Sequence, residues 1–454
     1  MVISNTMYEY LRWRGDLSFE ADPFNEVDNV ILAQLSYVDF DGIVSESGED
    51  KILLTEVCGR YWEMHTEEEI RARESFVKLS PFLLKPMAES RRFSTMKLSG
   101  YVNHVEKSSE AQMSAIRFEL DDGTTYVAFR GTDETIIGWK EDFNLSYMLR
   151  TEGQRLAVEY MNRNFKDTTL RLRVGGHSKG GNFAVFAAAF SLPEVRTQIG
   201  PVYSNDGPGF LEEITETEEY QDVLLKTISI IPSESVIGRL LNSSTMPIVV
   251  KSSRKGIMQH DAMTWQVMGN QFVYAERSND SLFIEKVMDE WIRNVDVESR
   301  RFFVDRLFEA LMAGGGETMK DFRSSTLSEL AESVATLRKL PKDQQKELNS
   351  VLMQLVRSGE KTLYERIGQN GGLPEFVRRW AAKKEDAIAA LENAKEQEET
   401  EENGEFAGAR ITESDRESEI EDASETAAGN SEEELRQQMR KNSLERAASE
   451  AKGS

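Results

Sequence analysis

Residues 171–190 read RLRVGGHSKGGNFAVFAAAF. A short β-type run leads into the pentapeptide GHSKG at residues 176–180, and a helix rich in small residues follows at once. This is the pattern G-x-S-x-G between a strand and a helix, a sharp turn that exposes the serine hydroxyl above the carboxyl end of the strand. We expect Gly176 and Gly180 to be required, because side chains there would collide with the sheet or the helix. The segment predicts Ser178 as a nucleophile.

A serine hydroxyl is a weak nucleophile and needs a general base. The chain has four histidines, which are His65, His104, His177 and His260. In enzymes with this turn the chain order is nucleophile, acid and then histidine. Of the four, only His260 follows Ser178, and His177 lies inside the turn, where we expect its ring to point away from the serine. The order therefore predicts His260 as the base.

The third member of a triad is a carboxylate that orients the imidazole. Two candidates follow predicted strands between the serine and the histidine: Glu234 in SIIPSESVIG and Asp206 in YSNDGPGF. Asp206 is also suited to cap the turn that its Asp-Gly-Pro-Gly neighbours indicate. Asp261 adjoins the histidine and would have to fold back awkwardly. Glu234 is the preferred acid and Asp206 the alternative.

Acyl transfer also requires hydrogen-bond donors where negative charge develops on the substrate oxygen. One predicted donor is the backbone N–H of Lys179, directly after the nucleophile. The other comes from residues 125–143, TYVAFRGTDETIIGWKEDF, where Gly131 allows a close backbone approach and Thr132 offers an N–H and a hydroxyl. The apolar residues within 135–149 are interpreted as a core helix rather than as a flap over the site.

The first 280 residues alternate between short Val- and Ile-rich runs and helical stretches, a pattern that favours a mostly parallel sheet covered by helices. An early helix is predicted around Val27 to Val38. Asp121-Asp122-Gly123 is a hairpin signal, so the first two predicted strands should be antiparallel. The predicted strands are 115–120, 126–129, 172–174, 202–204, 228–231 and 248–250.

Three parts are expected along the chain. Residues 1–280 form the α/β domain. Residues 281–390 form a helical extension, because apolar residues recur every three or four positions, as in the stripe from Ile284 to Val295. Residues 391–454 carry 19 acidic and 8 basic residues and form a disordered acidic tail. The extension is interpreted as a small helical bundle, with a partner-binding groove as the alternative.

Composition excludes several classes of function. The formal net charge of −24 argues against nucleic-acid binding and against docking on anionic lipid. The single cysteine, Cys58, excludes an intrachain disulfide and a cysteine-cluster metal site. The N-terminal residues are charged where a signal peptide is apolar, and the run from Phe183 to Leu192 is too short to span a membrane. We expect a cytoplasmic protein without metal or cofactor.

Two groups of motifs suggest a family. VAFRGT (127–132) with Trp139 and Asp142, then GHSKGG and the lone His260, resembles the fungal-type class 3 lipases of the α/β-hydrolase superfamily. YLRWRGDLSFEADPFNEVDNVILAQLSYVDF (10–40), YSNDGPGF and QHDAMTWQV resemble an uncharacterised bacterial family of lipase-like α/β-hydrolases. The resemblance covers about residues 5–275, and the helices from Leu282 onward and the tail lie outside it.

The resemblance implies an α/β-hydrolase fold with Ser178 and His260 as nucleophile and base, and with Thr132 and Lys179 in the oxyanion hole. Glu234-Ser235-Val236 matches the Asp-x-Val of the lipases, with Glu in place of Asp. Asp142 matches a lipase Asp that supports the oxyanion loop.

The Lys179 side chain stands where lipases carry an apolar residue and could favour an anionic substrate. The expected reaction is hydrolysis of lipid-like or other carboxylic esters through an acyl-enzyme. The rival hypothesis is a catalytically idle binding module that engages a protein partner through its helices and tail.

Overall fold

The computed structural model describes residues 5–73, 77–106, 111–132 and 136–313, with positions 341, 342, 344, 350, 351 and 354. All of these belong to one compact unit, Met1–Gly359. The predicted tail and most of the predicted helical extension beyond residue 313 lie outside the described residues.

The core of the molecule is a mixed eight-stranded sheet whose strands are hydrogen-bonded in chain order. Strands β1 to β4 pair antiparallel, and strands β4 to β8 pair parallel. This is the mostly parallel sheet that the alternating pattern predicted. The strands are β1 (Ile52–Leu53), β2 (Lys97–Glu106), β3 (Ala111–Glu119), β4 (Thr124–Phe129), β5 (Arg171–His177), β6 (Ile199–Asn205), β7 (Thr227–Pro232) and β8 (Ile248–Val250).

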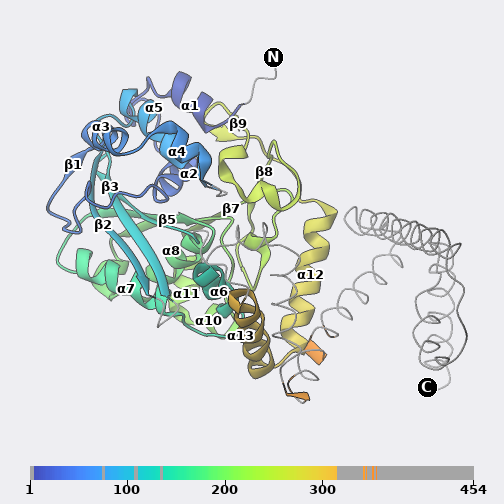
Figure 1. Cartoon of the computed structure of the whole chain (residues 1–454). Helices are drawn as coiled ribbons and strands as arrows, with labels where there is room; N and C mark the ends of the chain where they lie inside the picture. The colour runs from blue at the N-terminus through green and yellow to red at the C-terminus, as the bar shows by residue number, and fades with distance from the viewer. Residues whose placement is uncertain are drawn as a thin grey trace, which may run out of the picture. The chain divides into compact units, whose positions relative to one another are not determined.

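Helices cover both faces of the sheet (Figure 1). On one side lie α1 (Met7–Arg14), α2 (Glu26–Leu35), α3 (Leu54–Met64), α4 (Glu67–Ala72), η1 (Ser80–Leu83) and α5 (Leu84–Glu89). On the other lie α7 (Glu152–Phe165), α8 (Lys179–Phe190), α9 (Pro193–Arg196), α10 (Glu212–Thr215) and α11 (Glu218–Leu224).

The alternation of side chains along β4 explains the two layers. Tyr126 and Ala128 belong to the apolar core beneath α2, and Val127 and Phe129 belong to the core beneath α7 and α8. A strand that is buried on both faces needs apolar residues at every position, which is why this run has no polar residue between Tyr126 and Phe129.

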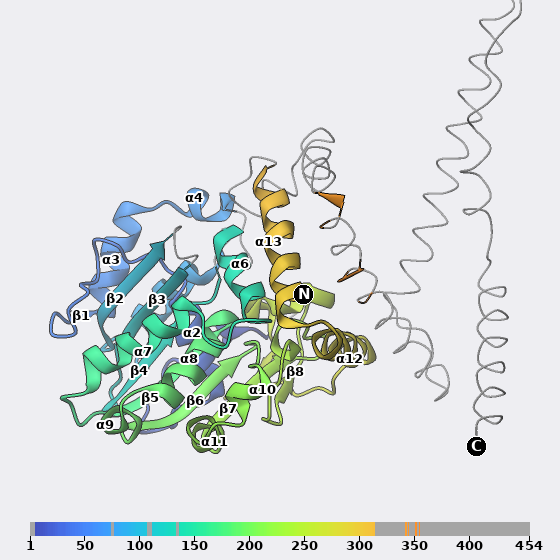
Figure 2. The ribbon, with the colours of Figure 1, turned by 90° about the horizontal axis from the view of Figure 1, so that it is seen from below.

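The remaining elements follow β4 and β7. They are α6 (Ile136–Asn144), η2 (Ile237–Arg239), η3 (Gly256–His260), η4 (Ala262–Thr264), β9 (Val267–Met268), β10 (Gln271–Phe272), α12 (Asn279–Asn294) and α13 (Val297–Ala313). Helix α13 lies beside α6 (Figure 2). No helix of the described part combines the length and the apolar character that crossing a bilayer requires.

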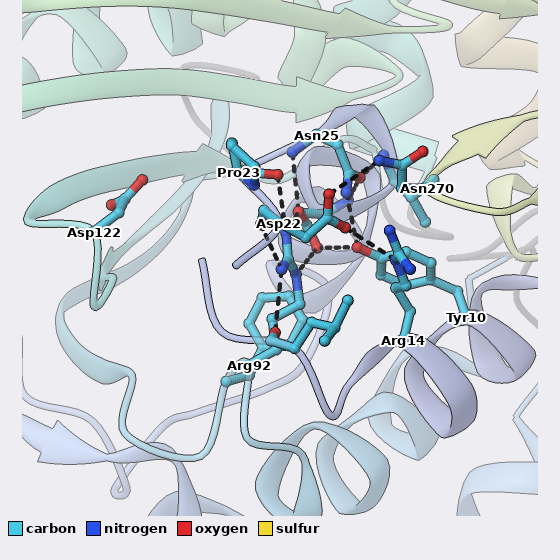
Figure 3. Close-up of polar contacts among 12 residues, drawn as sticks. Tyr10, Arg14, Asp22, Pro23, Asn25, Arg92, Asp122 and Asn270 are labelled. Carbon is cyan, nitrogen blue, oxygen red and sulfur yellow. Dashed lines mark hydrogen bonds and ion pairs between the residues drawn. The ribbon is translucent and has the colours of Figure 1, made fainter. Parts of the chain in front are cut away.

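A buried ion pair joins the segment after α5 to the first turn of α2. Arg92 donates from Nε to Asp28 Oδ1 at 2.8 Å, and both side chains are inaccessible to solvent. The same guanidinium donates to the backbone oxygens of Asp22 and Pro23, and Tyr10 donates its hydroxyl to Asp28 at 2.9 Å (Figure 3). Because each charge is hydrogen-bonded, the desolvation that burial costs is offset.

Candidate active site

The turn between β5 and α8 holds Ser178 in a backbone conformation that few side chains adopt, with φ 58° and ψ −135°. Its neighbours explain why the turn needs glycine. A Cβ atom at Gly176 would lie 2.3 Å from the carbonyl carbon of Gly180, and one at Gly180 would lie 2.1 Å from the carbonyl oxygen of Phe129. Such strain persists only where the surrounding structure fixes it, and here it presents the Ser178 hydroxyl at the carboxyl edge of the sheet.

The Ser178 hydroxyl faces a histidine that is far away in sequence. Ser178 Oγ lies 3.0 Å from His260 Nε2, and His260 Nδ1 lies 2.6 Å from Asp206 Oδ2. A carboxylate only accepts hydrogen bonds, so Nδ1 carries the proton and Nε2 accepts from the serine hydroxyl. This is the tautomer in which an imidazole can remove the serine proton.

Asp206 is buried at the end of β6, with φ 49°. Its second oxygen, Oδ1, accepts from the Ser235 hydroxyl at 2.5 Å and from the Gly238 N–H at 3.2 Å. These bonds leave Oδ2 directed at His260. The carboxylate is thus fixed by the β6 turn and by the loop after β7.

Glu234, the acid preferred from sequence, is placed differently. Its carboxylate accepts a hydrogen bond from the backbone N–H of Gly256, at the start of the helix η3 that ends at His260. The structure therefore brings Ser178, His260 and Asp206 together and leaves Glu234 at the base of the histidine loop. The neighbouring Ser235, rather than Glu234, turns inward toward the site.

The predicted oxyanion residues lie beside the turn that carries Ser178. The backbone at Gly131 passes so close that a Cβ there would be 2.9 Å from Ser178 Cβ and 2.5 Å from the carbonyl oxygen of His177. Thr132 follows, and its hydroxyl donates to Asp142 Oδ2 at 2.5 Å. Asp142 thus holds the Thr132 side chain.

Asp142 has an unusual electrostatic environment. Burial raises the pKa of its carboxyl to about 6, and the nearby cation of Lys179 and the Thr132 hydrogen bond only partly oppose this shift. Its other oxygen, Oδ1, is buried and accepts no hydrogen bond among the described residues.

Lys179 corrects one expectation. Its backbone begins helix α8, as predicted, but its ammonium group is buried and lies 2.8 Å from Glu141 Oε2. Glu141 also accepts from the backbone N–H groups of Gln112 and Gly153. The lysine charge is therefore neutralised inside the protein and is not presented to an anionic substrate.

The interpretation of residues 135–149 as a core helix is only partly right. Helix α6 is present, but its buried residues include Lys140, Glu141 and Asn144. Its aromatic Phe143 is 39% exposed and contacts helix α13 instead of the main core. The helix is packed through charged and polar groups, which apolar counting does not detect.

Sequence reasoning gave His177 no role. Its Nε2 lies 2.8 Å from the carbonyl oxygen of His260, and its Nδ1 lies 2.9 Å from the Tyr37 hydroxyl. The only signal in the sequence was that His177 directly precedes the nucleophile. Its two hydrogen-bond partners lie 83 and 140 positions away, so no local pattern could identify them.

Within the part of the chain that the structure describes, no group of three or more His, Cys, Asp or Glu side chains is arranged to hold a metal ion.

Residues 87–309 match the family model described as Mbeg1-like. No curated protein matches the chain. Among solved structures, the chain is similar to a crystal structure of M37 lipase, with 17% identity, a TM-score of 0.28, and coverage of 39% of this chain and 71% of the lipase. It is also similar to a fungal lipase from a lipase–inhibitor complex, with 14% identity, a TM-score of 0.24, and coverage of 34% of this chain and 66% of that lipase.

The sheet order and the strand–serine–helix turn are those of the α/β-hydrolase fold that the motifs predicted. The matched residues differ from the expected span of about 5–275 at both ends. The match begins at residue 87, after the motif at 10–40, and it continues through α12 and most of α13, which were expected to lie outside it.

Proposed function

We propose that this lipase-like α/β-hydrolase cleaves carboxylic esters through an acyl-enzyme intermediate. Ser178 is the nucleophile, His260 the general base and Asp206 the acid that orients the imidazole. The main support for the proposal is an unbroken chain of hydrogen bonds, from Ser178 Oγ to His260 Nε2 at 3.0 Å and from His260 Nδ1 to Asp206 Oδ2 at 2.6 Å.

The reaction follows from this order. Ser178 Oγ attacks the ester carbonyl carbon while its proton passes to His260 Nε2, and the carbonyl oxygen becomes an oxyanion. The C–O bond to the leaving alcohol then breaks, and the alcohol takes that proton from His260. A water molecule repeats the sequence on the acyl-enzyme, releasing the carboxylic acid and restoring the serine.

The oxyanion is stabilised by the backbone N–H groups of Lys179 and Thr132, since the Thr132 hydroxyl already donates to Asp142. Donors that are already in place cost no reorganisation at the moment of reaction. The hydrogen bond from the Thr132 hydroxyl to Asp142 supports this role, because it fixes the residue beside Ser178.

Lipid-like esters are the proposed substrates. Two apolar side chains of helix η3, three and two positions before His260, are exposed, Ile257 at 48% and Met258 at 43%, and they offer an apolar rim for an acyl chain. A cytoplasmic site of action and a protein partner of the C-terminal region complete the proposal. Both rest on composition, namely the lone Cys58 and the acidic tail.

A fluorophosphonate probe tests the function with the full chain. Wild type should be labelled, Ser178→Ala should not, and Ser191→Ala, a buried serine at the other end of α8, should be labelled like wild type. A panel of p-nitrophenyl esters of increasing chain length then gives the acyl preference. Folded wild-type protein that resists the probe would favour the idle binding module, and labelling of Ser178→Ala would move the nucleophile elsewhere.

A further inference from the structure

Helices α12 and α13 each contact an element that holds part of the candidate site. Helix α12 contacts the loop that binds Asp206, and helix α13 contacts helix α6, which binds Thr132. We propose that α12 and α13 position the catalytic groups: Ser281 on α12 acts on Asp206 through Ser235, and Asp305 on α13 acts on Thr132 through helix α6. This inference rests on the proposed function and adds positioning residues to it.

The first connection begins at the N-terminal turn of α12. The buried Ser281 donates its hydroxyl to the backbone oxygen of Ser235 at 2.6 Å. Ser235 in turn donates its own hydroxyl to Asp206 Oδ1 at 2.5 Å. A single residue therefore separates helix α12 from the carboxylate that holds His260.

Further contacts fix α12 to the same loop. The backbone N–H of Ser278 donates to the oxygen of Ser233 at 2.8 Å. Glu285 accepts from Arg239 Nε at 2.9 Å and pairs with Arg277 at 2.7 Å. Because the loop of residues 233–239 supplies both donors to Asp206 Oδ1, its attachment to α12 sets the direction of that carboxylate.

The second connection runs through α6. Lys140 Nζ lies 3.1 Å from Asp305 Oδ1, and the rings of Phe143 and Phe308 meet edge to face with centroids 5.5 Å apart. Lys140 and Phe143 are three positions apart and share one side of the helix. Helix α13 lies beside α6 in both views (Figures 1 and 2).

The two residues of α6 that lie between Lys140 and Phe143 contact the candidate site instead. Glu141 binds the Lys179 ammonium at 2.8 Å, and Asp142 accepts from the Thr132 hydroxyl at 2.5 Å. Helix α6 therefore lies between α13 and the oxyanion residues. A shift of α6 that follows the loss of its α13 contacts would move both Thr132 and Lys179.

Catalysis is sensitive to such shifts, since a misplacement of about 1 Å costs roughly 100-fold in rate. Stability is less sensitive, because Asp305 is partly exposed and a pair of this kind contributes little. Positioning and simple structural support can therefore be separated by measurement.

The experiment uses the full chain and compares Ser281→Ala and Asp305→Asn with wild type. Each variant should lower kcat and the rate constant of fluorophosphonate labelling by about 10-fold, with KM for a p-nitrophenyl ester within about twofold of wild type. Two variants should keep rates near wild type: Ser281→Thr, which retains the hydroxyl, and the swap of Lys140→Asp with Asp305→Lys. Glu298→Gln, at an exposed position in the first turn of α13, is the matched control.

The outcomes test the positioning role and the proposed ester hydrolysis separately. Wild type that is not labelled removes the proposed function. Wild type that is labelled, together with Ser281→Ala and Asp305→Asn that react at its rate, overturns the positioning role and leaves the function standing. A loss of rate that matches a loss of folded protein by circular dichroism also overturns it.

Discussion

The imidazole Nε2 of His177 lies 2.8 Å from the main-chain carbonyl oxygen of His260, and the centroids of the two rings are 4.6 Å apart. Because a carbonyl oxygen only accepts, His177 Nε2 carries the proton and Nδ1 accepts from the Tyr37 hydroxyl. Burial lowers the pKa of His177 well below its usual value, so the ring is neutral at pH 7. His177 thus anchors the backbone of the proposed base without placing a charge beside it.

Replacing His177 by Phe should keep the ring volume and lose both hydrogen bonds. We expect kcat to fall about 10-fold because His260 is no longer anchored. The free energy of unfolding should fall by about 1–3 kcal/mol because buried polar partners are left without hydrogen bonds. Tyr37→Phe, which keeps the contact between the two histidines, should have the smaller effect on kcat. Wild-type kcat in His177→Phe would show that the contact is not needed.

Asp206→Asn and Glu234→Gln should separate the two acid candidates. The Asn side chain cannot hold His260 in the productive tautomer, so kcat should fall by about 1,000- to 10,000-fold. Glu234→Gln should stay within about threefold, since Gln keeps an oxygen that accepts from Gly256. The measurement is ester turnover at saturating substrate. The reverse ranking would return the acid role to Glu234.

Lys179→Met removes one partner of the buried pair with Glu141. The uncompensated carboxylate should lower the free energy of unfolding by about 3–5 kcal/mol, as measured by denaturant titration. Lys166→Met, on an exposed lysine, should change it by less than about 1 kcal/mol. The ratio of kcat/KM for an anionic and a neutral ester should be the same in Lys179→Met and wild type. A selective loss on the anionic ester would show that the ammonium reaches the substrate.

Asp142→Asn should change how stability depends on pH. Between about pH 4, where an ordinary carboxyl titrates, and pH 6, the folded protein retains a proton on Asp142 that the unfolded chain has released. The free energy of unfolding of wild type therefore falls as pH rises through this window. Relative to wild type, the Asn variant should gain about 2 kcal/mol from pH 4 to 6 and nothing further above pH 6. A difference that is independent of pH would contradict the raised pKa.

Arg92→Met leaves Asp28 buried without its cation. We expect the free energy of unfolding to drop by about 3–5 kcal/mol. Its neighbour Arg91 is exposed, and Arg91→Met should cost less than about 1 kcal/mol. Thermal melts of the two variants give the comparison directly, and equal melting temperatures would mean that the ion pair contributes nothing.

The sheet was largely predictable because its strands are buried on both faces. All six predicted strands lie within or overlap β3 to β8, and the predicted hairpin at Asp121-Asp122-Gly123 is the antiparallel connection of β3 to β4. Strand β2 was missed for a physical reason. Gly100 adopts φ +62° and the register shifts between Ser99 and Val102, so its apolar residues do not alternate regularly.

The candidate site was predictable where chain order constrains it and not where loop path decides it. Chain order predicted that Ser178 and His260 would meet. Asp206 and Glu234 both follow parallel strands that end at the same edge, so the sequence could not show which carboxylate faces His260. The partners of Lys179 and His177 depend on contacts across 38 and 83 positions, which no local pattern reports.

Helix α2 has a consequence for how the protein is made. Nine of its ten residues are buried. Its Asn29 amide donates to Asn205, which lies 176 positions later. The Asn205 amide in turn donates to the backbone oxygen of Gly176, in the turn that carries Ser178. A ribosome needs roughly 10–35 s to synthesise that interval. During this delay an apolar helix has emerged without the strands that cover it. We therefore expect holding chaperones to bind the nascent chain until residue 205 has left the exit tunnel.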